Sequence, residues 1–207
     1  MNVSANSTDT DDRWEAFGAL LAAIGLQVLL GVLSETRGWQ VWTLPWWFWL
    51  LLIGPELMLL AILAFGNQPR EELTLALVMG GVNVLALTVL IGSIVGSHEH
   101  SGGQLLLKGI TVWTTNITAF GIVFWQLGHI RKRQGRQFRF PQQESSSTRW
   151  QPSFFDFLYV SFTNSIAFSP TDAMPMTKMA KLLMLVESSV SAVAILLVAA
   201  RAVNILK

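Results

Sequence analysis

The sequence is dominated by apolar segments that are long enough for a helix to cross a lipid bilayer. Four of them occupy residues 14–33, 44–65, 73–95 and 105–130, and a fifth occupies residues 178–206. A spanning helix needs ~20 mostly apolar residues, and in lipid every backbone polar group must find its partner within the protein. These segments therefore predict an all-α, polytopic helical membrane protein with five or six transmembrane helices.

Composition supports this class and excludes several functions. Only 13% of the 207 residues are charged, against about 25% in an ordinary soluble domain. The absence of cysteine excludes a disulfide framework and a thiolate metal site, and the net charge of +1 is too small for a strongly basic nucleic-acid-binding protein. The sequence has no glycine-rich phosphate loop and no nucleophile elbow, so we expect neither an enzyme nor a bound cofactor or metal.

The hydropathy pattern divides the chain into four parts. Residues 1–13 are polar and acidic and are predicted to form a disordered tail, while residues 14–130 are predicted to form a bundle of four transmembrane helices. Residues 131–152 form a loop that is first basic and then rich in Gln and Ser. Residues 153–207 form a C-terminal module with a short hairpin helix before the last span.

The basic half of this loop sets the expected orientation. Residues 131–139 carry five of the fourteen Lys and Arg residues. Because Lys and Arg in short loops remain on the cytoplasmic side, we expect the loop and the N-terminus to be cytoplasmic, in the plasma membrane of a bacterium. The same cations are expected to bind anionic lipid headgroups, at about 1 kcal/mol for each charge. They are Arg131, Lys132, Arg133, Arg136 and Arg139.

The apolar run at 154–168 is too short to span the bilayer upright, because a helix rises only about 1.5 Å per residue. The run either crosses with the help of its polar neighbours or re-enters from the cytoplasm. Crossing gives six spans with both termini inside, and re-entry gives five spans with the C-terminus outside. We favour six spans, because Arg201 and Lys207 then lie on the cytoplasmic side.

Two carboxyl groups lie inside spanning segments, where an ionisable group is costly and marks a functional candidate. Glu56 follows Gly54 and Pro55, and a proline in a helix frees a backbone carbonyl and kinks the helix. Its carboxyl group is a proton or cation site, or a hydrogen-bonded group that locks two helices together. Glu187 is likewise either a helix-interface residue or a carboxylate that lines a cavity. Asn83 and Asn116 are expected to form hydrogen bonds across helix interfaces.

The C-terminal module combines a short helix, a polar turn and a long helix. This order resembles the pore-helix, filter and inner-helix module of bacterial two-transmembrane potassium channels. An Asp-x-Leu-Tyr-x-Ser-Phe opening is matched by Asp156, Leu158, Tyr159, Ser161 and Phe162, and a later Asp-x-x-Pro-x-Thr by Asp172, Pro175 and Thr177. The resemblance covers about a quarter of the chain. It implies an ion pathway and a tetramer.

The filter itself departs from the family. The channels have Thr-Val-Gly-Tyr-Gly, whereas residues 167–171 here are Ala-Phe-Ser-Pro-Thr. Selectivity needs stacked backbone carbonyls in unusual conformations that glycine allows, and Pro170 fixes its own φ. We therefore expect no conventional potassium filter. The whole chain also resembles uncharacterised bacterial multi-pass membrane proteins with a similar Asp-Phe-Leu-Tyr-x-Ser-Phe-Thr run, a resemblance that implies no particular activity.

Two functions are consistent with these observations. The first is a permeation protein for an ion or small solute such as a monovalent cation, assembled as a homo-oligomer. Its candidate path residues are Asn164, Ser169, Thr171, Asp172, Glu187 and Glu56. The second is a non-conducting scaffold that binds lipid or a partner, in which Ser169 or Asp172 caps a turn and Pro175 begins the last helix. A water-filled path to Asp172 or Glu187 favours permeation, and a dry hairpin favours a scaffold.

Overall fold

The computed structural model describes the helices, two short strands and part of the connections. The described residues are 3–37, 47–66, 69–95, 102–130, 136–145, 150–167 and 173–205. In chain order the elements are α1 (Val3–Thr36), α2 (Trp47–Phe65), α3 (Pro69–Val95), α4 (Gly102–Ile130), β1 (Phe138–Arg139), α5 (Gln142–Ser145), α6 (Phe154–Ala167), β2 (Met174–Pro175) and α7 (Lys178–Ile205). The prediction of an all-α protein is confirmed, because almost all of the described chain is helical.

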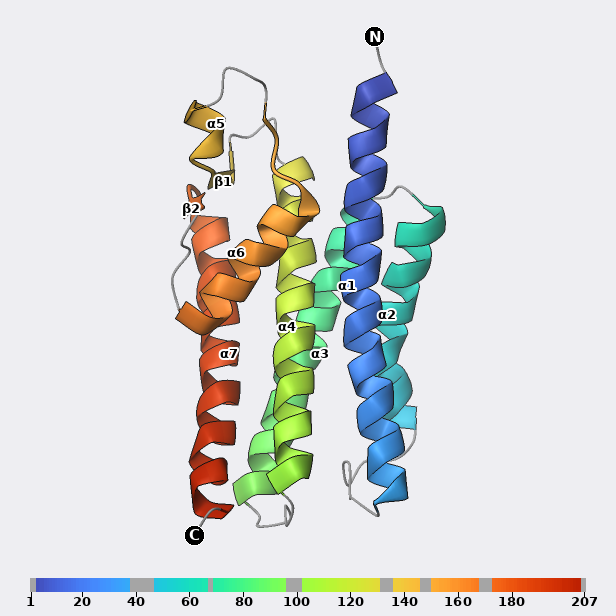
Figure 1. Cartoon of the computed structure of the whole chain (residues 1–207), viewed down its shortest axis with the longest axis vertical. Coiled ribbons are helices and arrows are strands. Elements are labelled where there is room, and N and C mark those ends of the chain that lie inside the picture. The colour runs from blue at the N-terminus through green and yellow to red at the C-terminus, as the bar shows by residue number, and fades with distance from the viewer. Residues whose placement is uncertain are drawn as a thin grey trace.

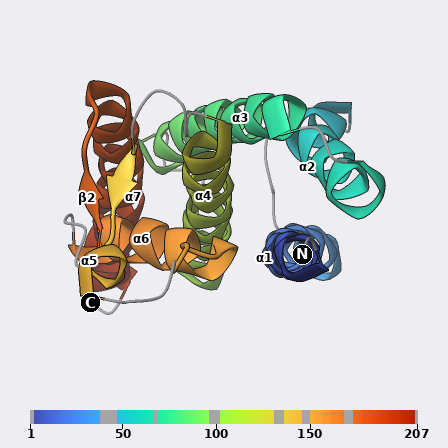
Figure 2. The same ribbon diagram turned by 90° about the horizontal axis from the view of Figure 1, so that it is seen from above.

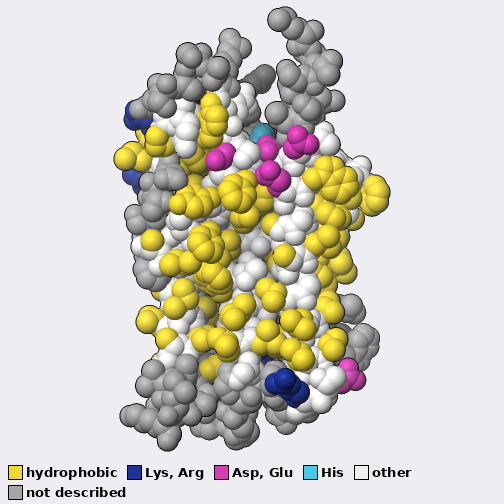
Figure 3. All heavy atoms as spheres, in the orientation of Figure 1, with side chains coloured by type: hydrophobic (Ala, Val, Ile, Leu, Met, Phe, Trp, Pro, Cys, Tyr) yellow, Lys and Arg dark blue, Asp and Glu magenta, His cyan; other side chains and the backbone are white. Residues whose placement is uncertain are grey.

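Four helices are long and apolar enough to cross a membrane. Their spanning parts are Thr10–Thr36, Arg70–Ile91, Gly103–His129 and Lys178–Ala200, and α2 adds a shorter apolar helix at Ile53–Phe65. Many large apolar side chains on these helices are exposed, as suits a surface that faces lipid. Figure 3 shows them over the middle of one face, with charged side chains toward its upper and lower ends. The protein is therefore a helical membrane protein.

The first helix begins earlier than the sequence indicated. α1 starts at Val3, so polar residues that we expected in a disordered tail over 1–13 instead extend the helix beyond its apolar part. Helix propagation is cooperative once a first turn exists, which allows an anchored spanning helix to continue into a polar segment. The expectation of a tail without structure was wrong for the described part of this segment.

α4 is the central helix of the bundle. It contacts α1, α3, α6 and α7, and Figure 2 shows it between α1 and α3 on one side and the α6–α7 pair on the other. Of its spanning part 72% is buried, against 33% for α3 and 28% for α1 and α7. Because α4 has the least contact with lipid, it can carry polar side chains on several faces.

α6 begins near the upper end of the bundle, and β2, the next element of the chain, lies at the same end (Figure 1). The chain before α6 pairs with the chain after it, because β1 and β2 are antiparallel with Phe138 opposite Pro175 and Arg139 opposite Met174. α6 has 14 residues, which gives a length of about 21 Å against a hydrocarbon core of about 30 Å. Because β1 and β2 lie at the same end of the bundle, the structure agrees with the re-entrant alternative for residues 154–168 and not with the preferred crossing. The two chain ends lie at opposite ends of the molecule (Figure 1).

Hydrogen bonds at the N-terminus of α6 define where this helix begins. The hydroxyl oxygen of Ser153 accepts a hydrogen bond from the backbone N–H of Asp156, and Oδ2 of Asp156 accepts one from the backbone N–H of Ser153 at 2.7 Å. This reciprocal pair is a capping box, which stabilises the first turn of a helix. Oε2 of Glu15 in α1 accepts a further bond from the N–H of Phe155 at 3.1 Å. The start of α6 is thereby attached to α1.

The start of α7 differs from the sequence-based expectation. The hydroxyl oxygen of Thr177 accepts a bond from the N–H of Ala180, which makes Thr177 the cap of the helix. Thr177 also donates to Oε1 of Gln137 at 2.6 Å, which adds a side-chain bond to the β1–β2 pairing. Pro175 lies in β2 and does not begin the helix, so that expectation was wrong. A cap at Ser169 or Asp172 falls on residues outside the described ones.

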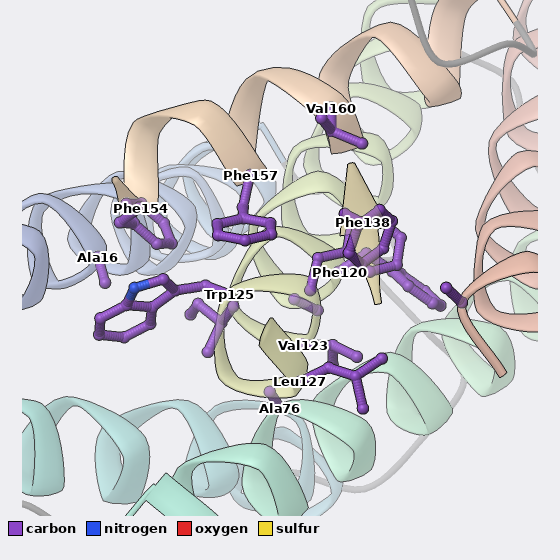
Figure 4. Packing of buried hydrophobic residues seen from close by; sticks show 14 of the residues in the cluster. Ala16, Ala76, Phe120, Val123, Trp125, Leu127, Phe138, Phe154, Phe157 and Val160 are labelled. Carbon is purple, nitrogen blue, oxygen red and sulfur yellow. The ribbon is translucent and has the colours of Figure 1, made fainter. Parts of the chain in front are cut away.

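Aromatic side chains fill the space between α4, α6 and β1. Trp125 of α4 meets Phe154 of α6 edge to face, and Phe138 of β1 meets Phe157 in the same way (Figure 4). Gly121 of α4 permits this close packing, because a Cβ there would lie 3.0 Å from the side chain of Leu158. α6 is therefore packed tightly against the central helix.

Candidate functional site: two buried carboxyl groups beside α4

Two polar clusters lie on different faces of α4 inside the bundle. Thr115 of α4 lines a cavity between α1, α2, α3 and α4 that also contains Glu56, and we refer to this as the Glu56 cavity. The next residue, Asn116, bonds to α7 near Glu187. We refer to Asn116, Ser161, Asn164, Glu187 and Ser191 as the Glu187 cluster. Successive residues of a helix point in directions about 100° apart, so neighbours in the sequence can serve different sites.

The Glu56 cavity has a volume of about 40 Å³. Its lining consists of Gln27, Leu30, Glu56, Met79, Val82, Asn83, Ala86, Lys108, Thr111, Val112 and Thr115. The side chains of Glu56 and Lys108 are each 1% exposed, so both ionisable groups are removed from the surface of the molecule. Polar residues belong to the lining, but the surface that they present to the cavity is mostly apolar.

The carboxyl group of Glu56 is only half satisfied. Nε2 of Gln27 in α1 donates to its Oε1 at 2.6 Å. Its Oε2 has no hydrogen-bond partner among the described residues, and the same is true of the hydroxyl oxygen of Thr115. Buried polar atoms almost always have a partner in the protein or in ordered water. Oδ1 of Asn116 in the Glu187 cluster also lacks a partner among the described residues, so each of the two sites contains a buried polar atom that is unpaired.

The position of Glu56 follows from its helix. Glu56 lies nine residues from each end of α2 and directly after Pro55. On the opposite wall, Nδ2 of Asn83 in α3 donates to the backbone carbonyl of Val112 in α4 at 3.3 Å. This bond joins two walls of the cavity, as we predicted for Asn83. The predicted bond between Glu56 and a neighbouring helix is also present, through Gln27.

The Glu187 cluster is satisfied at both carboxyl oxygens. The hydroxyl of Ser161 donates to Oε1 of Glu187, and Nδ2 of Asn164 donates to Oε2 at 2.6 Å. The side chain of Glu187 is 0% exposed. Nδ2 of Asn116 donates to the hydroxyl oxygen of Ser191 at 3.0 Å, which confirms the predicted role of Asn116 across a helix interface. The cluster thus joins α4, α6 and α7.

α6 is tied to α7 at a second point of this cluster. Nδ2 of Asn164 also donates to the backbone carbonyl of Met184 at 3.0 Å, and the hydroxyl of Ser188 donates to the backbone carbonyl of Asn164 at 3.3 Å. A short helix that ends inside the bundle needs such partners, because backbone groups at membrane depth must be buried in protein or line a cavity. The cluster therefore has the geometry of a structural lock.

A third polar cluster closes the upper end of the bundle. Nη1 of Arg13 in α1 lies 2.7 Å from Oε1 of Glu72 in α3, and Nε2 of Gln126 in α4 donates to Oε2 of Glu72. Nη2 of Arg13 also donates to backbone carbonyls at the end of α2, those of Ile62 and Gly66 among them. A cation at a helix C-terminus is favourable because the last carbonyls lack partners. Sequence reasoning missed this cluster, whose members lie 49 to 59 positions apart.

The predicted path residues are divided by the structure. Asn164 and Glu187 meet in one cluster, and Glu56 lies in the other. Ser169, Thr171 and Asp172 lie outside the described residues. Sequence reasoning missed Gln27 and Lys108, although Lys108 could have been found as an ionisable residue inside a predicted span.

The predicted lipid-binding residues are only partly described. Arg131, Lys132 and Arg133 lie outside the described residues, while Arg136 and Arg139 lie in the segment around β1. Nη1 of Arg136 donates to Oε1 of Gln143 at 3.3 Å. Over the described ranges, no group of three or more His, Cys, Asp and Glu side chains could hold a metal ion.

Comparison with known proteins assigns no family to this chain and no role to these sites. No protein-family model, curated protein or solved structure matches this chain. The resemblance of the C-terminal module to potassium channels therefore remains a prediction from its residues, and the function has to be argued from the geometry of the two clusters.

Proposed function

We propose that this protein moves protons or a small monovalent cation across the membrane, with the Glu56 cavity as the binding site on the path. One observation carries the proposal: a carboxyl group that is 1% exposed lines a cavity between four helices of the bundle and has one oxygen without a hydrogen-bond partner among the described residues. A polar group that is buried without its partner is costly, so such a group inside a span indicates a function. The cavity lies within one chain, and the proposed site needs no second copy.

The Glu187 cluster supports a bracing role in this proposal. Both oxygens of Glu187 have donors, and Asn164 uses its side chain and its backbone carbonyl to hold α7. The sequence predicted that a tightly bonded hairpin would favour a scaffold over a path, and α6 is bonded to α7 in this way. We therefore assign the path to the α1–α4 bundle and the brace to α6 and α7.

Flux through proteoliposomes tests this function. The purified protein is reconstituted, and proton, sodium and potassium movement is followed separately with a pH-sensitive dye and ion-selective probes. We expect flux of at least one of these cations, and we expect Glu56→Gln to reduce it about tenfold or more because the binding group is lost. Glu35→Gln is the matched control, since Glu35 is an exposed carboxyl group at the lower end of α1. Absence of flux with proven insertion would contradict the proposal.

A second candidate function is lipid or partner binding at the upper end of the molecule. The described cations at this end are Arg13, Arg70, Arg136, Arg139, Lys178 and Lys181, whereas Arg37 lies at the lower end. Acidic residues also lie at this end, so the attraction of anionic headgroups, at about 1 kcal/mol for each cation near the surface, is expected of the basic loop that includes Arg136 and Arg139. Reversal of the charges at 131–139 should reduce the anionic lipid that co-purifies with the protein or release a partner in pull-down. If neither changes, the candidate fails.

The same charge asymmetry supports a cytoplasmic upper end, because Lys and Arg in short loops remain inside. The chain has no cysteine, so single cysteines report their side of the membrane without background. In intact cells we expect a membrane-impermeant maleimide to label Arg37→Cys and to spare Arg139→Cys. The reverse pattern would place the upper end outside, as the resemblance to potassium channels implies.

A further inference from the structure

We propose that the start of α7, together with β2, binds an anionic phospholipid of the leaflet at the upper end of the molecule. The site combines two exposed lysines with an exposed apolar stripe that continues from them along α7. The inference is independent of the Glu56 cavity. It rests on the second candidate function and deepens it, because it names where the lipid binds and which groups hold its headgroup and its acyl chain.

The two lysines lie on one side of the first turns of α7. Lys178 is the first residue of this helix and Lys181 lies three positions later, so their side chains are neighbours on the helix surface. Both are exposed, and in the part of the chain that the structure describes neither has an acidic partner. Two such ammonium groups at the end of a spanning helix attract an anionic headgroup.

Exposed methionines accompany the lysines. Met174 of β2 is 68% exposed, and Met176 and Met179 are also exposed. Apolar side chains are costly in water and favourable beside acyl chains, while lysine side chains reach from such a boundary to the headgroups. Figure 3 shows Lys and Arg side chains among apolar ones at the upper left edge, where Figure 1 places β2 and the start of α7. Asp and Glu side chains lie further to the right in this view.

An apolar stripe continues from the lysines toward the middle of α7. Its members are exposed and recur at intervals of three and four residues, as on one face of a helix. They are Leu182, Leu185, Val186, Ser189 and Val193. The hydroxyl of Ser189 donates to the backbone carbonyl of Leu185 at 2.8 Å, so it needs no outside partner. The stripe extends about 16 Å, which is close to half of a hydrocarbon core of about 30 Å and so matches one acyl chain of a single leaflet.

The β1–β2 pairing attaches the basic loop to this site. Arg139 of β1 lies opposite Met174, and the backbone N–H of Met176 donates to the carbonyl of Gln137 at 2.8 Å. Thr177, the cap of α7, is bonded to the side chain of Gln137 as well. A headgroup bound at the start of α7 therefore lies next to a strand that carries a cation of the basic loop, and its binding should stabilise the contact between loop and helix.

The charges favour a lipid over a second copy of this chain. A symmetric contact through this face would bring the lysines of both copies together, and like charges repel. A soluble anion would match the lysines but not the stripe. An anionic phospholipid supplies a negative headgroup for the lysines and an apolar chain for the stripe in one molecule.

Lipid retention by the full chain tests the inference. The protein in detergent is titrated with phosphatidylglycerol or with phosphatidylcholine, and native mass spectrometry counts the bound lipids and the protein copies. We expect preferential binding of phosphatidylglycerol, and an affinity about tenfold lower or more when Lys178→Gln and Lys181→Gln are combined, because both cations are lost. Lys181→Gln alone should weaken binding about fivefold. Arg37→Gln, which removes the same charge at the lower end, should leave binding unchanged.

Three results would overturn the inference. They are equal binding of the two lipids, unchanged binding in the double variant, and displacement of phosphatidylglycerol by an equal concentration of inorganic phosphate, which identifies a site for a free anion. A dimer that the double variant abolishes would identify a second copy as the occupant instead. Charge reversal at 131–139 separates the two lipid proposals: if it releases lipid and the double variant does not, the second candidate function stands and the site on α7 fails.

A measurement without substitutions covers the case in which these variants do not fold. Phosphatidylglycerol with a photoreactive group in its headgroup is bound to the unchanged protein and irradiated, and the labelled residues are identified by peptide mass spectrometry. We expect label on residues 174–181. Label confined to the lower end of the molecule, or to residues 131–136, would overturn the inference.

Discussion

Glu56 and Glu187 are two buried glutamates at a similar depth, and their surroundings differ in one respect. Each lies nine residues from the upper end of its helix, which is about 14 Å along the axis. Glu187 receives hydrogen bonds at both oxygens from α6, whereas Glu56 receives one bond from Gln27 and its other oxygen has no partner among the described residues. Both carboxyl groups are buried, so the number of hydrogen-bond donors is what distinguishes Glu187, which joins helices, from Glu56, the proposed binding group.

The difference arises from the helix that covers each carboxyl group. α6 approaches α4 closely at Gly121 and brings the short polar side chains of Ser161 and Asn164 to Glu187. α1 brings one long amide, Gln27, and apolar neighbours such as Leu30. The polar face of α6 therefore supplies both donors to Glu187, while α1 supplies one donor to Glu56 and lines the cavity beside it.

The largest effect is expected when the cavity is filled. Ala86 lines the Glu56 cavity, and Ala86→Val adds two methyl groups to a space of about 40 Å³. Cation flux should fall about tenfold or more while the protein remains folded, because the water that reaches Glu56 is displaced. Ala61→Val on the exposed face of α2 is the control. Equal flux in both variants would contradict the contrast between the two sites.

A smaller effect is expected for leucine at the two carboxyl positions. Glu187→Leu leaves one N–H of Asn164 without an acceptor, while Ser161 keeps the backbone carbonyl of Ile117, and we expect a cost of about 1–3 kcal/mol in the free energy of unfolding. Glu56→Leu removes the acceptor of Gln27 but adds apolar volume beside a cavity, and its cost should stay within about 1 kcal/mol. Thermal unfolding in detergent measures both. A larger cost for Glu56→Leu would reverse our assignment of lock and binding site.

The close approach of α6 to α4 is tested by glycine replacements. Gly121→Ala places a methyl group against Leu158, and we expect a destabilisation of about 1–3 kcal/mol from overpacking. Gly81→Ala in α3 has no atom within 4 Å of the added Cβ and should be stabilising by about 0.5 kcal/mol. If the two variants unfold at the same temperature, the hairpin is not tightly packed.

The smallest effects are expected for two neighbouring residues of α4. Asn116→Leu removes the bond to Ser191 and should cost about 0.6 kcal/mol. Thr115→Val removes a buried hydroxyl group without a hydrogen-bond partner, so stability should stay unchanged or rise by up to about 1 kcal/mol. Unfolding curves of both variants would sharpen the comparison, since a larger loss for Thr115→Val would mean that its hydroxyl is already satisfied.

Hydropathy was sufficient to predict the fold class, the spanning helices and three of the buried polar residues that matter. Glu56, Glu187 and Asn116 stand out because a polar group inside an apolar run is costly. The return of α6 could not be predicted, because it depends on a two-residue pairing of Arg139 with Met174 that carries no pattern. The partners of the carboxyl groups lie 23 to 29 positions away, so the sequence does not show which carboxyl is satisfied.

The central position of α4 has a consequence for the biogenesis of the protein. Helices emerge from the ribosome in chain order, so α1, α2 and α3 are available to cover one face of α4 when it is inserted. The face with Asn116 has no cover until α6 and α7 follow, and until then a polar amide faces lipid. A chain that stops before α7 therefore exposes the amide of Asn116 to lipid. Membrane chaperones and proteases recognise incomplete proteins by such exposed polar groups.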